Sequence, residues 1–129
     1  MIQQIKSLCA KLEEEKLDGL LVTKDENVAY LTGYDSRESW LLISHKEKFF
    51  LTDFRYLADA KKNLKNISVV KINGSIFCLV AELAKKFNLK RLGFESKNLA
   101  FAEYQKIKEE LPNTIDFVPT FDLVETLRE

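Results

Sequence analysis

A short charged segment, YDSRESW (residues 34–40), is the part of this sequence that first suggests chemistry. Three of the six residues 34–39 are charged, and Trp40 follows them at once and opens an apolar run. Charged side chains beside aromatic rings can form an active site, a contact for a molecule outside the chain, or a solvated connection. The residue types alone leave these three possibilities open.

Carboxylates near the ends of predicted strands form a second candidate site. Asp53 follows FFLT, Glu95 follows RLGF, and Asp116 lies inside the last apolar segment. Acidic residues on neighbouring strands of a mixed sheet can hold the two metal ions of a nuclease. Helix capping explains two of them without a metal, because Asp53 precedes a helix that starts at Phe54 and Glu95 lies near the next helix start. Capping is therefore the favoured interpretation.

The tetrapeptide DFRY, residues 53–56, carries a more specific signal. Asp53, Arg55 and Tyr56 fall in the first turn of a helix that follows a strand. Arg55 can pair with a nearby carboxylate through two parallel N–H bonds. We therefore expect a cap and an ion pair that together fix this strand-to-helix corner.

The remaining reactive side chains indicate no catalytic centre. His45 is the one histidine and falls at a predicted hairpin turn, where a histidine is usually solvated. Cys9 and Cys78 lie far apart in helical apolar patterns, which predicts two buried free thiols in a reducing compartment. The sequence lacks the motifs HxxxH, HExxH, CxxC, GxGxxG and GxSxG. We therefore expect no metal site and no catalytic residue in this chain.

The composition is typical of a single globular domain. The chain has 129 residues, 46% of them apolar and 31% charged, and a formal net charge of zero. A neutral chain lacks the excess of Lys and Arg that phosphate neutralisation requires, so nucleic acid is not expected as the main partner, and the nuclease hypothesis weakens. The amphipathic start has no signal-peptide core, and no apolar run approaches the ~20 residues of a membrane span. We expect a cytoplasmic protein that does not bind membranes.

Apolar periodicity and turn residues divide the chain into alternating helices and strands. Asp25 is expected to cap the second helix and Gly33 to close it in a left-handed conformation. Helices are predicted at residues 2–16, 25–33, 54–64, 74–88, 100–111 and 122–129, and strands at 18–24, 40–44, 49–53, 67–72, 90–96 and 114–121. Alternation of this kind predicts an α/β fold with helices on both faces, and the central hairpin makes the sheet mixed.

The end of the chain predicts a larger parent protein. The segment FDLVETLRE still shows a helical apolar pattern and carries no glycine cap. We therefore expect residues 1–129 to be one domain of a longer polypeptide. A stand-alone α/β binding module is the alternative.

These segments, taken in order, resemble the N-terminal domain of the creatinase/prolidase/aminopeptidase P family. The chain matches the family patterns N-x-x-Y-L-[ST]-G-[FY], D-x-R-Y and G-[FV]-E, and departs from it slightly at Lys16, where the family often has glycine. The matching positions are Asn27, Tyr30, Leu31, Thr32, Gly33 and Tyr34, then Asp53, Arg55 and Tyr56, then Gly93, Phe94 and Glu95.

The resemblance implies a ribonuclease H-like mixed sheet without nuclease activity. It also implies a following catalytic domain of pita-bread fold, absent from this chain, in which two Asp, one His and two Glu hold two divalent metal ions. The compact domain resembles most a bacterial Xaa-Pro dipeptidase, a cytoplasmic metallopeptidase. An aminopeptidase P or a creatinase relative is the alternative within the family.

The resemblance also implies a role for the charged segment. In related dimeric enzymes the chain after YLTG reaches towards the active site of the neighbouring subunit, so a homodimer is expected in the parent. Arg37 can then hold a substrate carboxylate, Asp35 or Glu38 an amine, and Tyr34 or Trp40 can stack on proline. The alternative is a solvated loop with Trp40 turned into the core.

Overall fold

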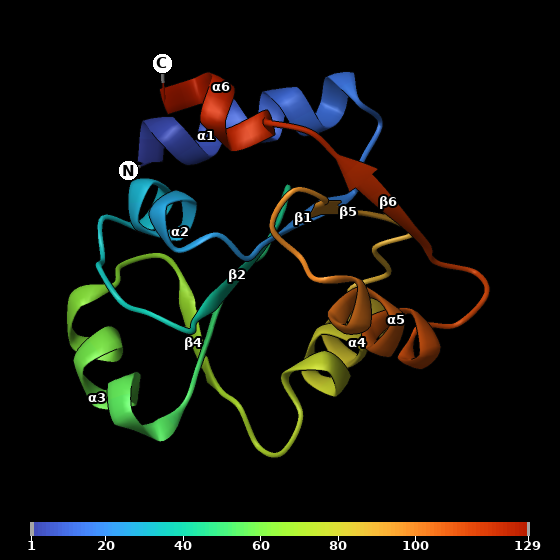
Figure 1. The fold of residues 1–129 in the computed structure, drawn as a ribbon. Coiled ribbons are helices and arrows are strands. Elements are labelled where there is room, and N and C mark those ends of the chain that lie inside the picture. Colours follow the sequence, from blue (N-terminus) through green and yellow to red (C-terminus); the bar gives the residue numbers. More distant parts are fainter. Residues whose placement is uncertain (1, 129) are drawn as a thin grey trace.

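One six-stranded sheet runs through the computed structural model, which describes residues 2–128. Its spatial order is β4-β3-β2-β1-β5-β6 (Figure 1). Strand β2 is antiparallel to β1 and β3, whereas the pairs β1–β5, β3–β4 and β5–β6 are parallel. The strands are β1 (Gly19–Val22), β2 (Trp40–Ser44), β3 (Lys48–Thr52), β4 (Ser68–Lys71), β5 (Arg91–Glu95) and β6 (Asp116–Thr120).

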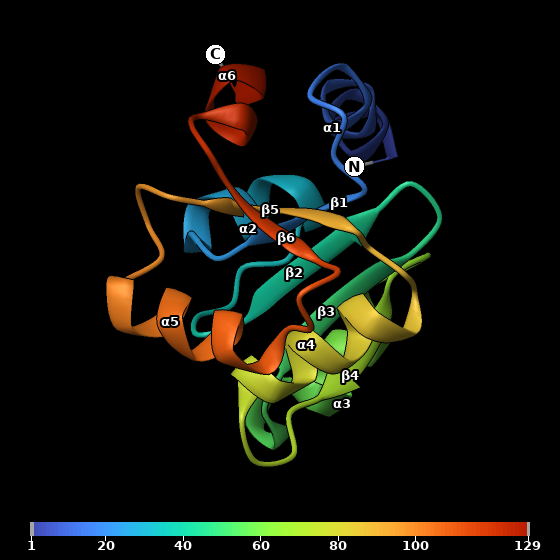
Figure 2. The same ribbon diagram turned by 90° about the vertical axis from the view of Figure 1, so that its right-hand side faces the viewer.

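Helices cover both faces of this sheet. Side chains of α1, α2, α3 and α6 pack in one core cluster, and side chains of α4 and α5 pack in the other. Figure 2 shows α1 and α6 on one side and α4 and α5 on the other. The helices are α1 (Ile2–Glu14), α2 (Asp25–Thr32), α3 (Phe54–Asn63), α4 (Ile76–Lys86), α5 (Phe101–Glu110) and α6 (Leu123–Arg128). The predicted order of elements and the mixed α/β class are confirmed.

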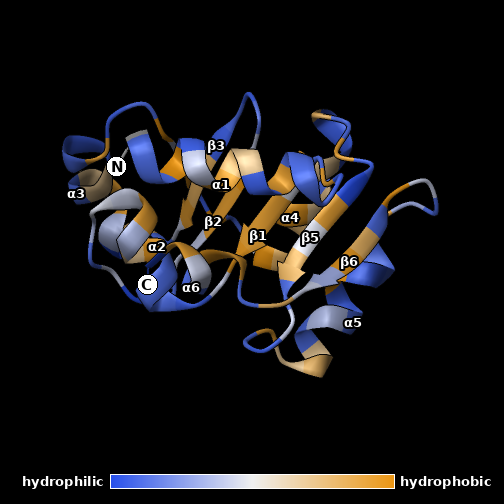
Figure 3. Cartoon of the chain, turned by 90° about the horizontal axis from the view of Figure 1, so that it is seen from above, coloured by the Kyte–Doolittle hydropathy of each residue, from blue (hydrophilic) through white to orange (hydrophobic). Residues whose placement is uncertain are grey.

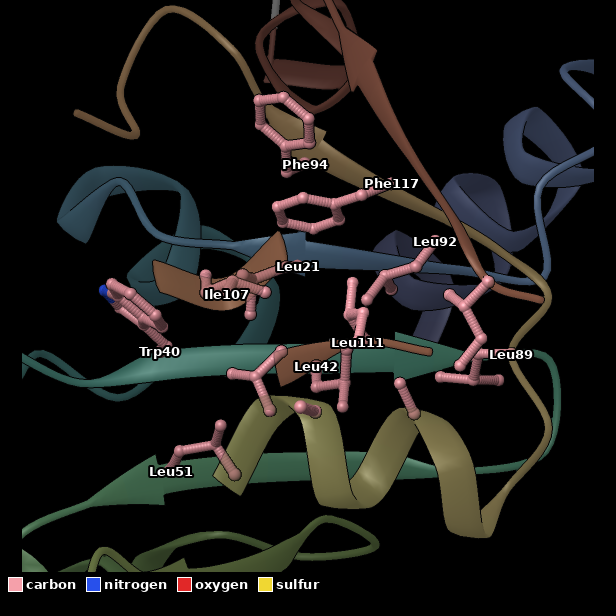
Figure 4. Packing of buried hydrophobic residues seen from close by; sticks show 14 of the residues in the cluster. Leu21, Trp40, Leu42, Leu51, Leu89, Leu92, Phe94, Ile107, Leu111 and Phe117 are labelled. Carbon is pink, nitrogen blue, oxygen red and sulfur yellow. The ribbon is translucent and has the colours of Figure 1, made fainter. Parts of the chain in front are cut away.

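The two faces of each central strand are both buried, which explains why these strands are continuous apolar runs. In β2, Leu42 points into the α4/α5 side and Leu41 into the α1/α2 side, and neither is more than 1% exposed. Figure 4 shows the cluster on the α4/α5 side, and Figure 3 shows apolar residues concentrated on the strands and polar residues on the outer helix surfaces. This burial from both sides fixes the register of the strands.

Two of the three expected helix caps are present, and the third is not. Gly33 closes α2 with φ 72°, and its N–H donates to Ala29 O at 2.7 Å. Asp53 caps α3 by accepting the N–H of Arg55 at 2.9 Å. Asp25 does not cap α2, contrary to expectation, because it already lies in the first helical turn and Lys24 occupies the cap position without a side-chain bond. The N–H groups of Asn27 and Val28 donate to Lys24 O, each at 3.0 Å.

Both cysteines are free thiols, but they are half-buried rather than buried. Cys9 lies on α1 and Cys78 on α4, so the sheet separates them. Within residues 2–128 no helix has both the length and the apolar character needed to cross a membrane.

Gly19 of β1 and Gly93 of β5 offer a test of how tightly these two paired strands are packed. A Cβ at Gly19 would lie 2.8 Å from the main-chain oxygen of Ile43, whereas a Cβ at Gly93 would meet ends of side chains, the nearest being Thr120 Cγ2 at 2.9 Å. Side chains can shift and a paired strand cannot. Gly19→Ala should therefore lower the free energy of unfolding by about 1–3 kcal/mol, and Gly93→Ala by less, in urea titrations. An equal loss in both variants would contradict this account.

Candidate functional site

The residues singled out by sequence gather mainly at one edge of the sheet. Strands β1, β3, β5 and β6 run in the same direction, so their carboxyl ends share that edge. The segment 33–39 enters the antiparallel strand β2 and therefore lies at this edge too. In open α/β sheets, binding sites form at the carboxyl ends of strands.

Glu95, the last residue of β5, binds the turn that leads into α2 and one side chain of that helix. Its Oε1 accepts the main-chain N–H groups of Thr23 at 2.7 Å and Lys24 at 2.9 Å, and its Oε2 accepts from Asn27 Nδ2 at 2.5 Å. The expectation placed Glu95 near the start of the helix that follows it, but its carboxylate instead binds the turn between β1 and α2 and the side chain of Asn27. Burial raises the pKa of Glu95, and the three donors partly offset that effect.

The contact between Asn27 and Glu95 joins two of the sequence motifs. Asn27 is fully buried, and its Oδ1 has no hydrogen-bond partner among the described residues. Asn98 Nδ2 donates to Thr23 Oγ1 at 2.9 Å and ties the chain after β5 to the chain after β1. Sequence reasoning missed Thr23 and Asn98. The available signal in the sequence was the presence of Asn27 and Glu95 beside apolar residues, which pointed to polar groups that need partners.

The C-terminal end of α2 fixes the beginning of the charged segment. The N–H of Tyr34 donates to Thr32 Oγ1 at 3.0 Å. The ring of Tyr34 packs edge-on against Phe50 at 5.7 Å, and its hydroxyl donates to Asp59 at 2.5 Å. Desolvation and this hydrogen bond raise the pKa of Tyr34 to about 12. Tyr30, one helical turn earlier, donates to Leu127 O at 3.1 Å and joins α2 to α6.

The charged segment itself is exposed only in part. Asp35, Arg37 and Glu38 are exposed, but Ser36 and Ser39 are buried. Ser39 Oγ lies 2.9 Å from Thr52 Oγ1, which anchors the segment to the end of β3. Within residues 2–128 Arg37 has no ion-pair partner.

Arg55 holds the other side of this segment. Its Nη2 donates to Asp53 Oδ2 at 2.6 Å and to Glu38 Oε2 at 2.8 Å, and its guanidinium lies 5.4 Å from the centre of the Tyr56 ring. The bonds from Arg55 lower the pKa of Asp53, and both carboxylates raise the pKa of Arg55. The expected cap and ion pair of DFRY are present, and the pair extends to Glu38.

Trp40 belongs to the core. It is 9% exposed and packs against Phe77 of α4 at 5.9 Å between ring centres. Figure 4 shows its indole beside the apolar side chains of that cluster. Of the two alternatives for Trp40, the structure therefore supports the core position, and Tyr34 is the half-buried aromatic residue of the segment.

The three carboxylates of the nuclease hypothesis do not converge. Asp53 and Glu95 follow or end parallel strands, but Asp116 begins β6 and pairs with Arg91 at the start of β5, on the opposite edge. The described part of the chain contains no group of three or more His, Cys, Asp or Glu residues placed to hold a metal ion. His45 is exposed in the β2–β3 turn, with Nε2 3.3 Å from Leu17 O.

Comparisons with known proteins agree with one another. The family model for the creatinase/prolidase N-terminal domain matches residues 4–129. The uncharacterized peptidase YqhT of Bacillus subtilis is 33% identical over 112 residues, which are 87% of this chain and 31% of that protein. A Xaa-Pro dipeptidase from Bacillus anthracis superposes with a TM-score of 0.92 at 33% identity, over 98% of this chain and 35% of that one.

A third similar protein has nearly the same extent as this chain. The structure of a Xaa-Pro aminopeptidase from Streptococcus pyogenes matches with a TM-score of 0.89 at 31% identity, over 98% of this chain and 95% of that chain. By contrast, the chain spans about a third of the lengths of the YqhT peptidase and the Bacillus anthracis dipeptidase.

Removal of the Glu95 carboxylate tests its role at α2. Glu95→Ala leaves three buried donors unpaired and should lower the free energy of unfolding by about 2–3 kcal/mol, measured by urea titration with circular dichroism. Glu110→Ala, at an exposed position on α5, is the control and should change it by less than about 0.5 kcal/mol. Similar small losses in both variants would show that Glu95 does not stabilise α2.

The pH dependence of stability tests the protonation of Glu95. Its pKa in the folded chain is raised above the ordinary 4.5, so the folded state binds the proton more tightly than the unfolded state does. The stabilisation that the folded state gains from this tighter proton binding is fully present below pH 4.5 and is lost as the pH rises through the folded-state pKa. Wild-type stability should therefore fall with rising pH relative to a Glu95→Gln variant. A rise relative to that variant would reverse the assigned direction.

Proposed function

Because this chain belongs to the creatinase/prolidase N-terminal domain family, we propose that it is the non-catalytic domain of a metal-dependent Xaa-Pro dipeptidase. The observation that carries the proposal is the exposed pair Asp35 and Arg37. Both lie at the tip of an anchored segment, and Arg37 lacks an ion-pair partner within residues 2–128. A charged tip on fixed supports is suited to a contact outside the domain.

The proposed contact is the active site of a neighbouring subunit in a homodimer. Arg37 can hold the carboxylate of an Xaa-Pro dipeptide in a bidentate pair, and Asp35 can hold its amine. Glu38 contributes indirectly, because Arg55 already binds it. Tyr34 positions the start of the segment through its bond to Asp59. In this proposal the domain controls access and orientation, and the chemistry takes place elsewhere.

Three exposed phenylalanines support a protein contact at the same edge of the sheet. Phe54, Phe101 and Phe121 are 74%, 71% and 65% exposed. Phe54 follows β3, Phe121 follows β6, and Phe101 starts the helix that follows β5, so each comes after a strand that points to this edge. Single exposed apolar side chains are common on protein surfaces, but three large ones at the same edge of the sheet are available for a contact outside the domain. We propose that they pack on the catalytic part of the parent or of its partner subunit.

The metal chemistry of the proposed parent is assigned to residues outside this chain. The described carboxylates do not fit a dinuclear centre, since Asp53 is bound by Arg55 and Glu95 by three donors of its own chain. We propose that two divalent ions are held by the catalytic domain of the parent. We also propose a cytoplasmic location, because a similar domain, 25% identical to this chain, comes from a cytoplasmic peptidase of Mycobacterium tuberculosis.

An aminopeptidase P parent is a second candidate, because a Xaa-Pro aminopeptidase domain is 31% identical to this chain. The two enzymes differ in substrate length, so the purified parent can be assayed with a dipeptide such as Leu-Pro and with longer peptides that carry proline second. Cleavage of longer peptides alone would favour the aminopeptidase. An isolated chain that cleaved Leu-Pro in the presence of divalent metal would overturn the non-catalytic assignment.

Arg37→Ala in the full-length parent tests the proposed contact. The variant should lose about tenfold or more in kcat/KM for Leu-Pro, since a charge-assisted bond is worth about 1.5–3 kcal/mol. Its thermal stability should be unchanged, because an exposed arginine contributes little to folding. Lys90→Ala, at an exposed position before β5, is the control. Two results would contradict the contact. One is an unchanged kcat/KM in the Arg37 variant, and the other is a loss of folded protein while the specific activity of the remainder is unchanged.

A further inference from the structure

A groove lies along α1, away from the phenylalanines of the carboxyl edge. Its walls come from α1, from the β2–β3 turn, and from residues 63–67 between α3 and β4, and its volume is about 780 Å³. This volume is within the range of small-molecule sites, roughly 300–1,000 Å³. Figure 2 shows the β2–β3 turn on the same side of the molecule as α1.

The apolar lining of this groove comes from Ile5, Cys9, Ala10 and Ile67. Cys9 is half-buried, and its Sγ lies 3.9 Å from Ser44 O. Burial raises the pKa of the Cys9 thiol, and the charge of Lys48 partly offsets this effect. The thiol therefore adds no negative charge to the groove near neutral pH, and the Lys48 ammonium is close enough to act on it.

The charged lining is strongly one-sided. It holds the four lysines Lys6, Lys46, Lys48 and Lys65 and a single acid, Glu13. None of these lysines has an ion-pair partner in the part of the chain that the structure describes. The whole chain is neutral, so this local excess of positive charge is a property of the groove. Unpaired ammonium groups around an apolar depression attract an anion that also carries apolar surface.

We propose that this groove binds a small amphipathic anion, with an apolar body on Ile5, Ala10 and Ile67 and an acidic head group among the lysines. The lining includes Cys9 and His45, but each has its side-chain contact with a main-chain oxygen, that of Ser44 and that of Leu17, and not with the other, so the inference concerns binding and no reaction. It is independent of the proposed peptidase function, because it uses none of the residues of the charged segment.

Dodecanoate, below its micelle concentration, is a suitable probe with the purified 129-residue chain. A structurally similar chain of nearly the same extent has been solved, which supports folding of the domain by itself. Binding can be read from the rate of maleimide labelling at each cysteine by mass spectrometry. Cys9 should be protected in a saturable manner, whereas Cys78, on the opposite face of the sheet, should react at an unchanged rate. Dodecyltrimethylammonium, with the same tail and opposite charge, should protect neither.

Matched variants separate charge from apolar contact. Lys46→Glu combined with Lys48→Glu should weaken dodecanoate binding about tenfold or more. Ala10→Phe should fill the groove and abolish the protection of Cys9 by dodecanoate. Because Ala10 is exposed, this substitution does not alter the core. Lys108→Glu, on exposed α5, makes a charge change outside the groove and should leave the affinity unchanged. Circular dichroism confirms the fold of each variant.

Two results would overturn the proposal. One is an absence of Cys9 protection at saturating dodecanoate. The other is equal protection by the cationic probe or equal affinity of the Lys46/Lys48 variant, either of which would show non-specific binding. Neither result bears on Arg37 or on the peptidase assay of the parent, so the two proposals fail separately.

Discussion

The arrangement of the charged edge depends on one buried carboxylate. Glu95 binds the main-chain N–H groups of Thr23 and Lys24, in the turn between β1 and α2, and the side chain of Asn27 within α2, and it does so from the strand parallel to β1. These two N–H groups lie beyond the pairing of β1, and a main-chain N–H removed from water needs an acceptor from somewhere. Because β5 provides that acceptor, the direction of α2 is set relative to the centre of the sheet. The bonds from Tyr30 to Leu127 and from Asn98 to Thr23 hold the same helix and strand ends.

The position of α2 in turn fixes where the charged segment begins. Gly33 turns the chain out of the helix, Thr32 and Phe50 fix Tyr34, and Ser39 joins the end of the segment to Thr52. Arg55 adds a hold on Glu38, although this ion pair is exposed and contributes little to folding by itself. The segment is thus supported at several points, while Asp35 and Arg37 remain exposed. Rigid support of a charged tip lowers the entropic cost of placing it against a partner.

Features governed by neighbouring residues could be predicted from the sequence, and features governed by distant residues could not. Strand and helix order, the cap at Asp53 and the left-handed Gly33 each follow from a few adjacent residues. The cap at Asp25 was wrong because the helix starts one residue earlier than the local rule assumes: Lys24 is the cap residue, and its main-chain oxygen accepts the N–H groups of Asn27 and Val28. The same limit applies to Trp40, whose core position depends on Phe77 of α4. The lysines that line the groove come from three segments distant in sequence, so no single motif predicts it.

Thr32 of α2 lines the groove and bonds to the first residue of the charged segment, which sets a physical condition on any influence between the two sites. Thr32 lines the groove, and its hydroxyl donates to Val28 O at 2.7 Å and accepts from the N–H of Tyr34. An anion in the groove therefore lies near the residue that fixes the first position of the segment. Contact alone would not move the segment, because a ligand shifts an equilibrium only by the difference in its affinity for two conformations. Since the Thr32 hydroxyl bonds the helix and the segment at once, a second conformation would have to break one of these bonds, and that cost opposes any coupling through this residue.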